Sequence, residues 1–278
     1  MLTVLGNFTI GLPPFINAIT GNPTISTISP YKVYTYTSSG SMTFNNNNTV
    51  NYIIVGGGGG GGGGSNNTAY ATGGSGGSGG YIVTGSTTVI ANTLYNITIG
   101  SGGLGYGYVG ADTINYGSSS SFGTITALGG NCGNYGNDQC STNNGNQLGN
   151  RNGTNNYGMG GQGSNYGLTN TNVEQGQKGL TVSIGSTNYY YGGGGGGGTR
   201  NEDSYYNNNY GTQMNNDYLS NNYGVVYGGG KIVGSATFGS TATANTGGGG
   251  GGGGYNSTST PGGIPGGDGG SGICIIYF

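Results

Sequence analysis

The sequence predicts an all-β and irregular fold, in which short β-strands alternate with packed polyglycine II helices and α-helix is essentially absent. Glycine supplies 72 of the 278 residues, several times its usual share of about 7%. Three long glycine runs lie next to apolar, strand-like segments. No window shows the apolar period of about 3.6 residues that marks an amphipathic helix, and Gly, Asn and β-branched residues disfavour helix throughout.

The composition favours a folded chain over a disordered one. Disordered chains are usually rich in charge and proline and poor in aromatic and β-branched residues. Here only five residues are Lys or Arg and seven are Asp or Glu, whereas 24 are Tyr. Isoleucine, valine and threonine also gather in short clusters. We therefore expect ordered strands over most of the length.

Residues 1–50 are predicted to form an N-terminal β segment that serves attachment or packing. Strand signals occur at 8–10, 32–37 and 41–44, where Thr or Tyr alternates with apolar residues as in half-buried strands. Proline is expected to mark the turns, at Pro13, Pro14, Pro23 and Pro30.

Residues 51–278 are predicted to form one glycine-rich polyglycine II and β domain, with Asn/Tyr-rich loops at 131–228. Strand signals in this part of the chain are short and numerous, at 50–55, 81–84, 94–99, 123–128, 180–184, 231–233 and 273–277. Glycine-rich segments separate many of these strands, so both kinds of segment are expected to build the domain.

The glycine-rich segments are expected to form a packed interior and not linkers. Pure runs occupy 56–64, 192–198 and 247–254. Two further tracts, 73–80 and 266–272, repeat Gly-Gly-x every three residues, which is the period of polyproline II. Without a Cβ, such helices pack closely enough for backbone N–H and C=O groups to bond between neighbours.

A pure glycine run can be surrounded on all sides, whereas a Gly-Gly-x tract buries two edges and exposes the third. The pure runs are therefore predicted to be central and the tracts peripheral. At ~3.1 Å per residue, the first run would span roughly 28 Å. The glycines that mark this predicted core are Gly56, Gly60, Gly64, Gly192, Gly198, Gly247 and Gly254.

We predict no catalytic, cofactor-binding or metal-binding residues. The chain lacks His, a common acid–base group and metal ligand. Glu202 and Asp203 form an acidic cluster, but the alternating ligands of a calcium loop do not surround it. Residues 100–105 fit G-x-G-x-x-G without the following helix and distal acid of a dinucleotide site. We therefore expect a protein that is not an enzyme.

The charge pattern argues against nucleic acid and membrane as partners. Formal net charge is −2, and the basic residues are too scattered to form a phosphate-binding face. No segment approaches the roughly 18 apolar residues of a membrane helix. The basic residues are Lys32, Arg151, Lys178, Arg200 and Lys231.

Three cysteines do not make a disulfide framework for a chain of this length. Cys132 and Cys140 lie eight residues apart in an Asn/Gly-rich segment and could bridge it, or all three thiols could be free. Cys274 lies in an apolar strand and is interpreted as a small buried hydrophobic residue.

Two roles are open for the tyrosines of the Asn/Tyr-rich region. Tyrosine presents a flat amphipathic face and Asn both donates and accepts, so together they could bind a glycan or protein receptor. Alternatively, the rings cap the ends of the glycine core and pack against partner subunits. The candidates are Tyr189, Tyr190, Tyr191, Tyr205, Tyr206, Tyr210, Tyr218, Tyr223 and Tyr227.

The order of motifs resembles the glycine-rich domain of phage tail-fibre adhesins and of surface proteins of large DNA viruses. The pieces that carry the resemblance are Tyr-Ile-Ile-Val before the first run, Gly-Gly-Ser-Gly-Gly-Tyr at 76–81, the Ser-Ser-Phe-Gly segment within 118–130, and the C-terminal segment 269–277. The resemblance covers about 31–130 and 190–278, and the Asn/Tyr-rich middle departs from the phage pattern.

This resemblance implies a bundle of polyglycine II helices on a virion surface, with receptor-binding loops at one end. It implies a fibre or capsid decoration whose partners are other virion proteins and a host glycan or protein. The first residues lack the regions of a secretory signal, so we expect assembly into a particle as the route outward. Exposed strand edges favour a homo-oligomer, and a trimer is typical of fibres.

Two other classes of protein stay open. An ice-binding protein can also be a glycine-rich helix bundle, but it would be favoured by a regular threonine array on a flat face, and none is detectable in the sequence. An extracellular matrix or filament protein of a microbe is the second alternative.

Overall fold

The computed structural model describes residues 15–64, 74–106, 115–133, 176–198, 229, 238–254 and 264–278. Within these ranges the regular elements are β-strands and there is no α-helix, as predicted. The strands are β1 (Ile16–Thr20), β2 (Thr24–Ile28), β3 (Tyr31–Tyr36), β4 (Gly40–Phe44), β5 (Asn48–Val55), β6 (Ile82–Val89), β7 (Leu94–Thr98), β8 (Ser120–Phe122), β9 (Ile125–Ala127), β10 (Leu180–Ile184), β11 (Thr187–Tyr191) and β12 (Ile273–Tyr277).

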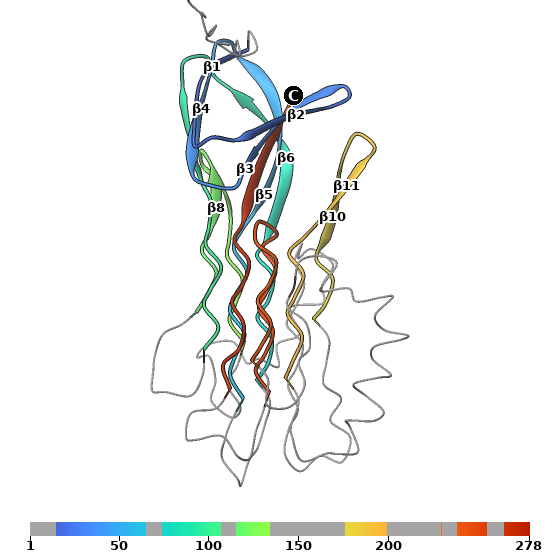
Figure 1. Cartoon of the computed structure of the whole chain (residues 1–278). Coiled ribbons are helices and arrows are strands. Elements are labelled where there is room, and N and C mark those ends of the chain that lie inside the picture. The colour runs from blue at the N-terminus through green and yellow to red at the C-terminus, as the bar shows by residue number, and fades with distance from the viewer. Residues whose placement is uncertain are drawn as a thin grey trace, which may run out of the picture.

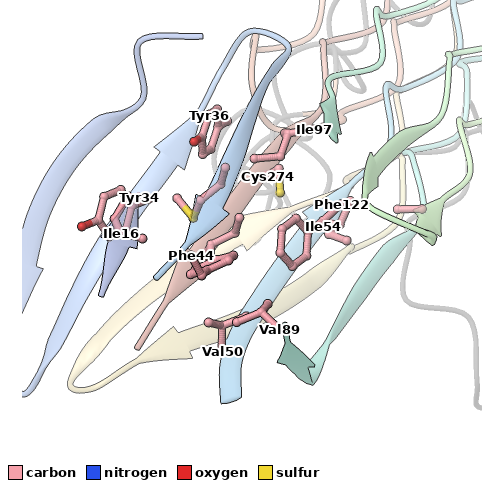
Figure 2. Close-up of a cluster of buried hydrophobic side chains, with 13 residues drawn as sticks. Ile16, Tyr34, Tyr36, Phe44, Val50, Ile54, Val89, Ile97, Phe122 and Cys274 are labelled. Carbon is pink, nitrogen blue, oxygen red and sulfur yellow. The ribbon is translucent and has the colours of Figure 1, made fainter. Parts of the chain in front are cut away.

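Two antiparallel five-stranded sheets pack face to face at one end of the molecule (Figure 1). We name them sheet A, with the order β1-β4-β7-β8-β9, and sheet B, with the order β2-β3-β12-β5-β6. Both contribute to one buried cluster, in which Phe44 and Phe122 of sheet A meet Ile54 and Cys274 of sheet B (Figure 2). Apolar side chains from the two inner faces therefore hold the sandwich together.

The opposite face of sheet B is also buried, because the hairpin β10–β11 covers part of it. Val182 and Tyr191 of the hairpin pack with Ile53 of β5 and Ile275 of β12. Side chains alternate between the faces of a strand, so Ile53 and Ile54 enter different clusters. This explains the unbroken apolar sequence at 52–55.

Strands β1 to β4 belong to the same two sheets as the later strands. β3 pairs with the C-terminal β12, which in turn pairs with β5, and β4 pairs with β7. The domain boundary expected after residue 50 falls inside β5. The N-terminal strands and the glycine-rich part are thus joined through shared sheets.

The predicted strands match the structure best where an apolar run is long. β12 coincides with the predicted 273–277, β10 with 180–184, and β5 begins two residues earlier than predicted. β1, β2, β8 and β11 were not predicted as individual strands. The predicted strands at 8–10 and 231–233 lie outside the described residues.

Most strands lead directly into, or out of, a glycine-rich segment. β5 continues into the run 56–64, β11 into 192–198, and the tract 264–272 leads into β12. Figure 1 shows these segments leaving the sandwich side by side in one bundle. The sandwich therefore sets the position at which each glycine segment starts.

Candidate functional site

The run 56–64, here called the central helix, has the hydrogen bonding of polyglycine II. Donors three residues apart reach the same neighbouring segment, which requires about three residues per turn. Toward 264–272 the N–H to C=O pairs are Gly58–Gly270, Gly61–Gly267 and Gly64–Ile264, at 2.8 to 2.9 Å. Toward two other segments they are Gly59–Ser78 and Gly62–Ser75, and Gly57–Ser118 and Gly60–Asn115.

The central helix also accepts hydrogen bonds with the same period from three further segments. The N–H to C=O pairs are Gly103–Gly58 and Tyr106–Gly61, Gly130–Gly57 and Gly133–Gly60, and Gly250–Gly59 and Gly253–Gly62. In these pairs both residue numbers rise together, so the segments run parallel to the central helix. In the donor pairs one number rises as the other falls, so those segments are antiparallel.

The six neighbours form a closed ring around the central helix. In order they are 74–80, 128–133, 115–119, 100–106, 264–272 and 247–254, alternately antiparallel and parallel to it. Each is bonded to the next through its backbone, by Ser78–Asn131, Gly117–Gly130, Ser118–Ser101, Gly269–Gly103, Gly270–Gly248 and Gly77–Gly250. The obligatory backbone groups are thus paired without sheet or α-helix.

Glycine is required in the centre because its neighbours are backbone atoms. A Cβ added at Gly58, Gly59 or Gly60 would overlap the carbonyl oxygen of Gly248, Asn131 or Leu104. The seven glycines predicted to mark the core are all buried. Two of them, Gly192 and Gly247, start their runs with φ of 69° and 65°, a conformation that glycine adopts without steric cost.

Three further segments lie outside the ring. The run 192–198 bonds to 74–80 and 247–254, and 176–179 bonds to 192–198. The segment 238–243 bonds to 247–254 and 264–272. The prediction of central pure runs therefore holds fully for 56–64. The run 247–254 lies in the ring together with the two Gly-Gly-x tracts, and 192–198 lies outside the ring, although both runs are buried.

The described parts of these segments all stop at the end of the bundle remote from the sandwich. We call this the loop end. Hydrogen bonds place its residues near one another, for example Gly64 with Ile264, and Gly74 with both Gly198 and Gly253. The chain therefore leaves and re-enters the bundle toward this end around the stretches 65–73, 107–114, 134–175 and 255–263, and between residues 198 and 238, of which only 229 is described.

Charged side chains are distributed unevenly between the described residues and these stretches. The described residues include three charged side chains, Lys32, Lys178 and Asp268, out of twelve in the whole sequence. The other nine lie outside the described ranges, between bundle segments whose described parts end toward the loop end. In the bundle, the Asp268 carboxylate accepts a hydrogen bond from the Gly105 N–H at 2.7 Å.

The structure separates the three consecutive tyrosines of the candidate binding group. Tyr191 is 6% exposed in the cluster beneath the hairpin, and burial, with a smaller contribution from Tyr189, raises the pKa of its phenol. Tyr189 packs partly buried against the same cluster, and Tyr190 exposes 41% of its surface. β11 turns the Tyr191 ring inward, so the face of this ring is covered within the chain, and the role of the group in partner binding stays a prediction.

The remaining candidates lie outside the described residues, namely Tyr205, Tyr206, Tyr210, Tyr218, Tyr223 and Tyr227. Among the cysteines, Cys132 is disulfide-bonded, Cys274 is a free buried thiol, and Cys140 lies outside the described residues. Burial raises the pKa of Cys274 to about 12. In the described ranges, acidic, His and Cys side chains do not gather in groups of three or more, and no helix there could cross a membrane.

The fold and the loop end define a β-sandwich protein whose strands extend into a hexagonally packed glycine bundle. The chain belongs to the glycine-rich domain family, whose model matches residues 35–278. A search of curated proteins finds no match to the chain.

Proposed function

We propose that this protein is a non-enzymatic structural component of a virion surface, as a fibre or capsid decoration, and that the stretches at its loop end attach the particle to a host. The observation that carries the proposal is topological. The described segments that flank the stretches outside the described ranges end toward one end of a closely hydrogen-bonded bundle. Binding residues are commonly placed on loops that a rigid scaffold positions.

The residue chemistry supports this assignment of roles. The bundle is almost free of charge, so it offers little for specific recognition beyond its shape. The stretches 134–175 and 199–228 contain many Asn and Tyr residues, a combination that gives adaptable hydrogen bonds and flat amphipathic contacts. The resemblance of the motif order to tail-fibre adhesins supports the location on a particle.

The first test is whether the protein is part of the particle. We expect mass spectrometry of gradient-purified particles, from the virus whose genome encodes this chain, to detect its peptides. Brief protease treatment of intact particles should release peptides from 199–228 before peptides from β5 or β12. Particles that lack the protein would contradict the assignment to the virion.

The second test is competition for attachment. Purified protein added to host cells should reduce adsorption of the particles, and a variant with residues 201–227 replaced by a short Gly-Ser linker should compete much less. Leu104→Ala is a matched control, because this exposed side chain lies on the flank of the bundle. Equal competition by the linker variant would contradict attachment through this stretch.

The geometry favours display over ice binding. An ice-binding face needs a regular array of one side chain on a flat surface. On the side of the ring that no outer segment covers, the exposed described residues differ from one another in chemistry. They include Leu104, Tyr116, Ser118 and Leu128. Thermal hysteresis is therefore expected to be absent.

A further inference from the structure

A groove lies between the face of sheet B and the hairpin β10–β11, at the sandwich end of the molecule. Its volume is about 410 Å³, within the range of about 300–1,000 Å³ that is typical of small-molecule sites. The hairpin turn at Gly185 lies against Ile28 and Ser29 at the end of β2. The hairpin thus contacts the sandwich at its turn as well as along its buried residues, and the groove is part of the fold.

Strand register places the groove residues in two rows across the sheet. Tyr277 of β12, Asn51 of β5 and Ser86 of β6 are direct neighbours in the first row. Ile53 and Thr84 are neighbours in the second row, nearer the bundle. Because side chains alternate along a strand, all five share the face that Val182 and Ser183 of the hairpin border.

The groove is lined by a partly buried tyrosine ring and by hydrogen-bonding groups, above two buried apolar side chains. Ile53 and Val182 are buried, and the Tyr277 ring is held edge-on to Tyr31 at 5.2 Å. Among the described residues, the hydroxyls of Thr84 and Ser86 have no hydrogen-bond partner. The amide of Asn51 makes one bond, a donation to the Tyr277 carbonyl at 3.4 Å.

These groups can both donate and accept, and none of the groove residues is charged. Burial, with a smaller contribution from Tyr31, raises the pKa of Tyr277, so its phenol stays a neutral hydroxyl at physiological pH. A charged ligand would find no opposite charge there. A ligand with several hydroxyls and one apolar face would match both the rim and the tyrosine ring.

We propose that this groove binds a neutral saccharide, with its apolar face on the Tyr277 ring and its hydroxyls bonded to Asn51, Thr84 and Ser86. Such a site lies on the sandwich, remote from the loop end, and it does not depend on the function proposed above. It would give the protein a second point of contact with a glycan-covered surface.

Saturation-transfer NMR tests the proposal, with galactose, mannose, N-acetylglucosamine and their disaccharides as neutral probes and glucuronate and glucosamine as charged ones. We expect transfer to at least one neutral sugar and not to the charged pair. Ser86→Trp should fill the groove and weaken binding by at least about tenfold. Thr88→Trp is the matched control, since Thr88 is exposed on the same face of β6 but lies outside the groove.

Ser183→Trp, on the opposite wall, provides a second blocking variant should Ser86→Trp fail to fold. The variant with residues 201–227 replaced separates this site from the loop end, because it should keep full saccharide binding. Absence of transfer to every neutral sugar would overturn the proposal. So would unchanged binding in both blocking variants, or loss of binding in the linker variant.

Discussion

The interior of this protein depends on the absence of side chains at particular residues. At Gly60 the space that a methyl group would occupy is filled by the carbonyl oxygen of Leu104. Replacing glycine by alanine usually stabilises a protein by about 0.4–1 kcal/mol where the backbone allows it, since it restricts the unfolded chain. Here the sign should reverse, because the neighbouring backbone atoms cannot move away without breaking their own hydrogen bonds.

Gly60→Ala is therefore predicted to lower the free energy of unfolding by about 3 kcal/mol or more, at the upper end of overpacking effects. Leu104→Ala changes the residue on the other side of the same contact, but its side chain is 66% exposed, so the change should stay within about 0.5 kcal/mol. Urea denaturation of both variants checks the prediction. A stabilised or neutral Gly60→Ala variant would contradict the close packing.

The buried thiol of Cys274 predicts a loss of stability in alkali. Burial raises the pKa of this thiol from its ordinary value of 9.0 to about 12. Below pH 9.0 the thiol is protonated in the folded and in the unfolded state. Above pH 9.0 the unfolded state loses the proton first, so the free energy of unfolding falls as the pH rises from 9.0 to about 12. The loss is about 1.4 kcal/mol by one pH unit above 9.0.

Chemical denaturation at about pH 8 and about pH 10 measures this loss. Cys274→Ala should reduce stability at the lower pH through lost packing, yet show a smaller further fall at the higher pH. Burial also raises the pKa of Tyr36, so a remainder of the alkaline loss should persist in the variant. An identical fall in both proteins would show that the thiol is not responsible.

At the scale of the element, the three-residue period distinguishes the two kinds of glycine segment. In 74–80 the Gly-Gly-x pattern leaves Ser75 and Ser78 half-buried while the glycines between them are buried. A shift of one residue would move Ser75 to the position of Gly76, where a Cβ overlaps the Gly195 carbonyl oxygen. In the pure run 56–64 a shift of one residue replaces glycine by glycine at every position but the last, where Ser65 would take the place of Gly64.

Deletion of Gly77 alone is thus predicted to destabilise the protein strongly, because it forces a serine into the interior. Deletion of the triplet 76–78 keeps serine at the outward position and should be tolerated better. Deletion of one glycine from 56–64 should be the mildest, since glycine still fills every position of the run except the last. Thermal midpoints of the three variants give the order, and a Gly77 deletion no worse than the triplet would contradict the period.

The elements that could be predicted from the sequence are those marked by a pattern within their own residues, such as an apolar run or a short repeat. Five consecutive apolar or aromatic residues identify β12, and the tripeptide repeat identifies the tracts. β8 has three residues, Ser120–Phe122, and exists because β7 and β9 pair with it. The segment of β11 was predicted to belong to the Asn/Tyr-rich loops at 131–228, and its strand form depends on pairing with β10.

At the scale of the whole molecule, the sandwich and the bundle have separate roles. The sandwich buries the large apolar side chains, and the bundle extends the same strands as backbone rods. From the sequence we could predict that the glycine runs would be buried. We could not predict which six segments would surround the central helix. The ring depends on strand order in the two sheets, and contacts such as β3 with β12 join residues far apart in the chain.

If the loop end only displays its stretches, their removal should leave the scaffold intact. Replacing residues 201–227 with a Gly-Ser linker is predicted to change the thermal midpoint by no more than a few degrees, because a loop-length change costs about 0.6 kcal/mol per doubling. Differential scanning calorimetry measures the change. A collapse of the unfolding transition would show that this stretch supports the bundle and is not merely displayed.

Amide hydrogen exchange of the central helix, followed by NMR with glycine-selective ¹⁵N labelling, tests the account most directly. The amides of Gly57, Gly58 and Gly59 should be protected as strongly as those of β5 and β12, because each donates to a different neighbouring segment inside the bundle. Exchange at the rate of an unstructured chain, with the strands still protected, would show that the run 56–64 is a linker and contradict the polyglycine II core.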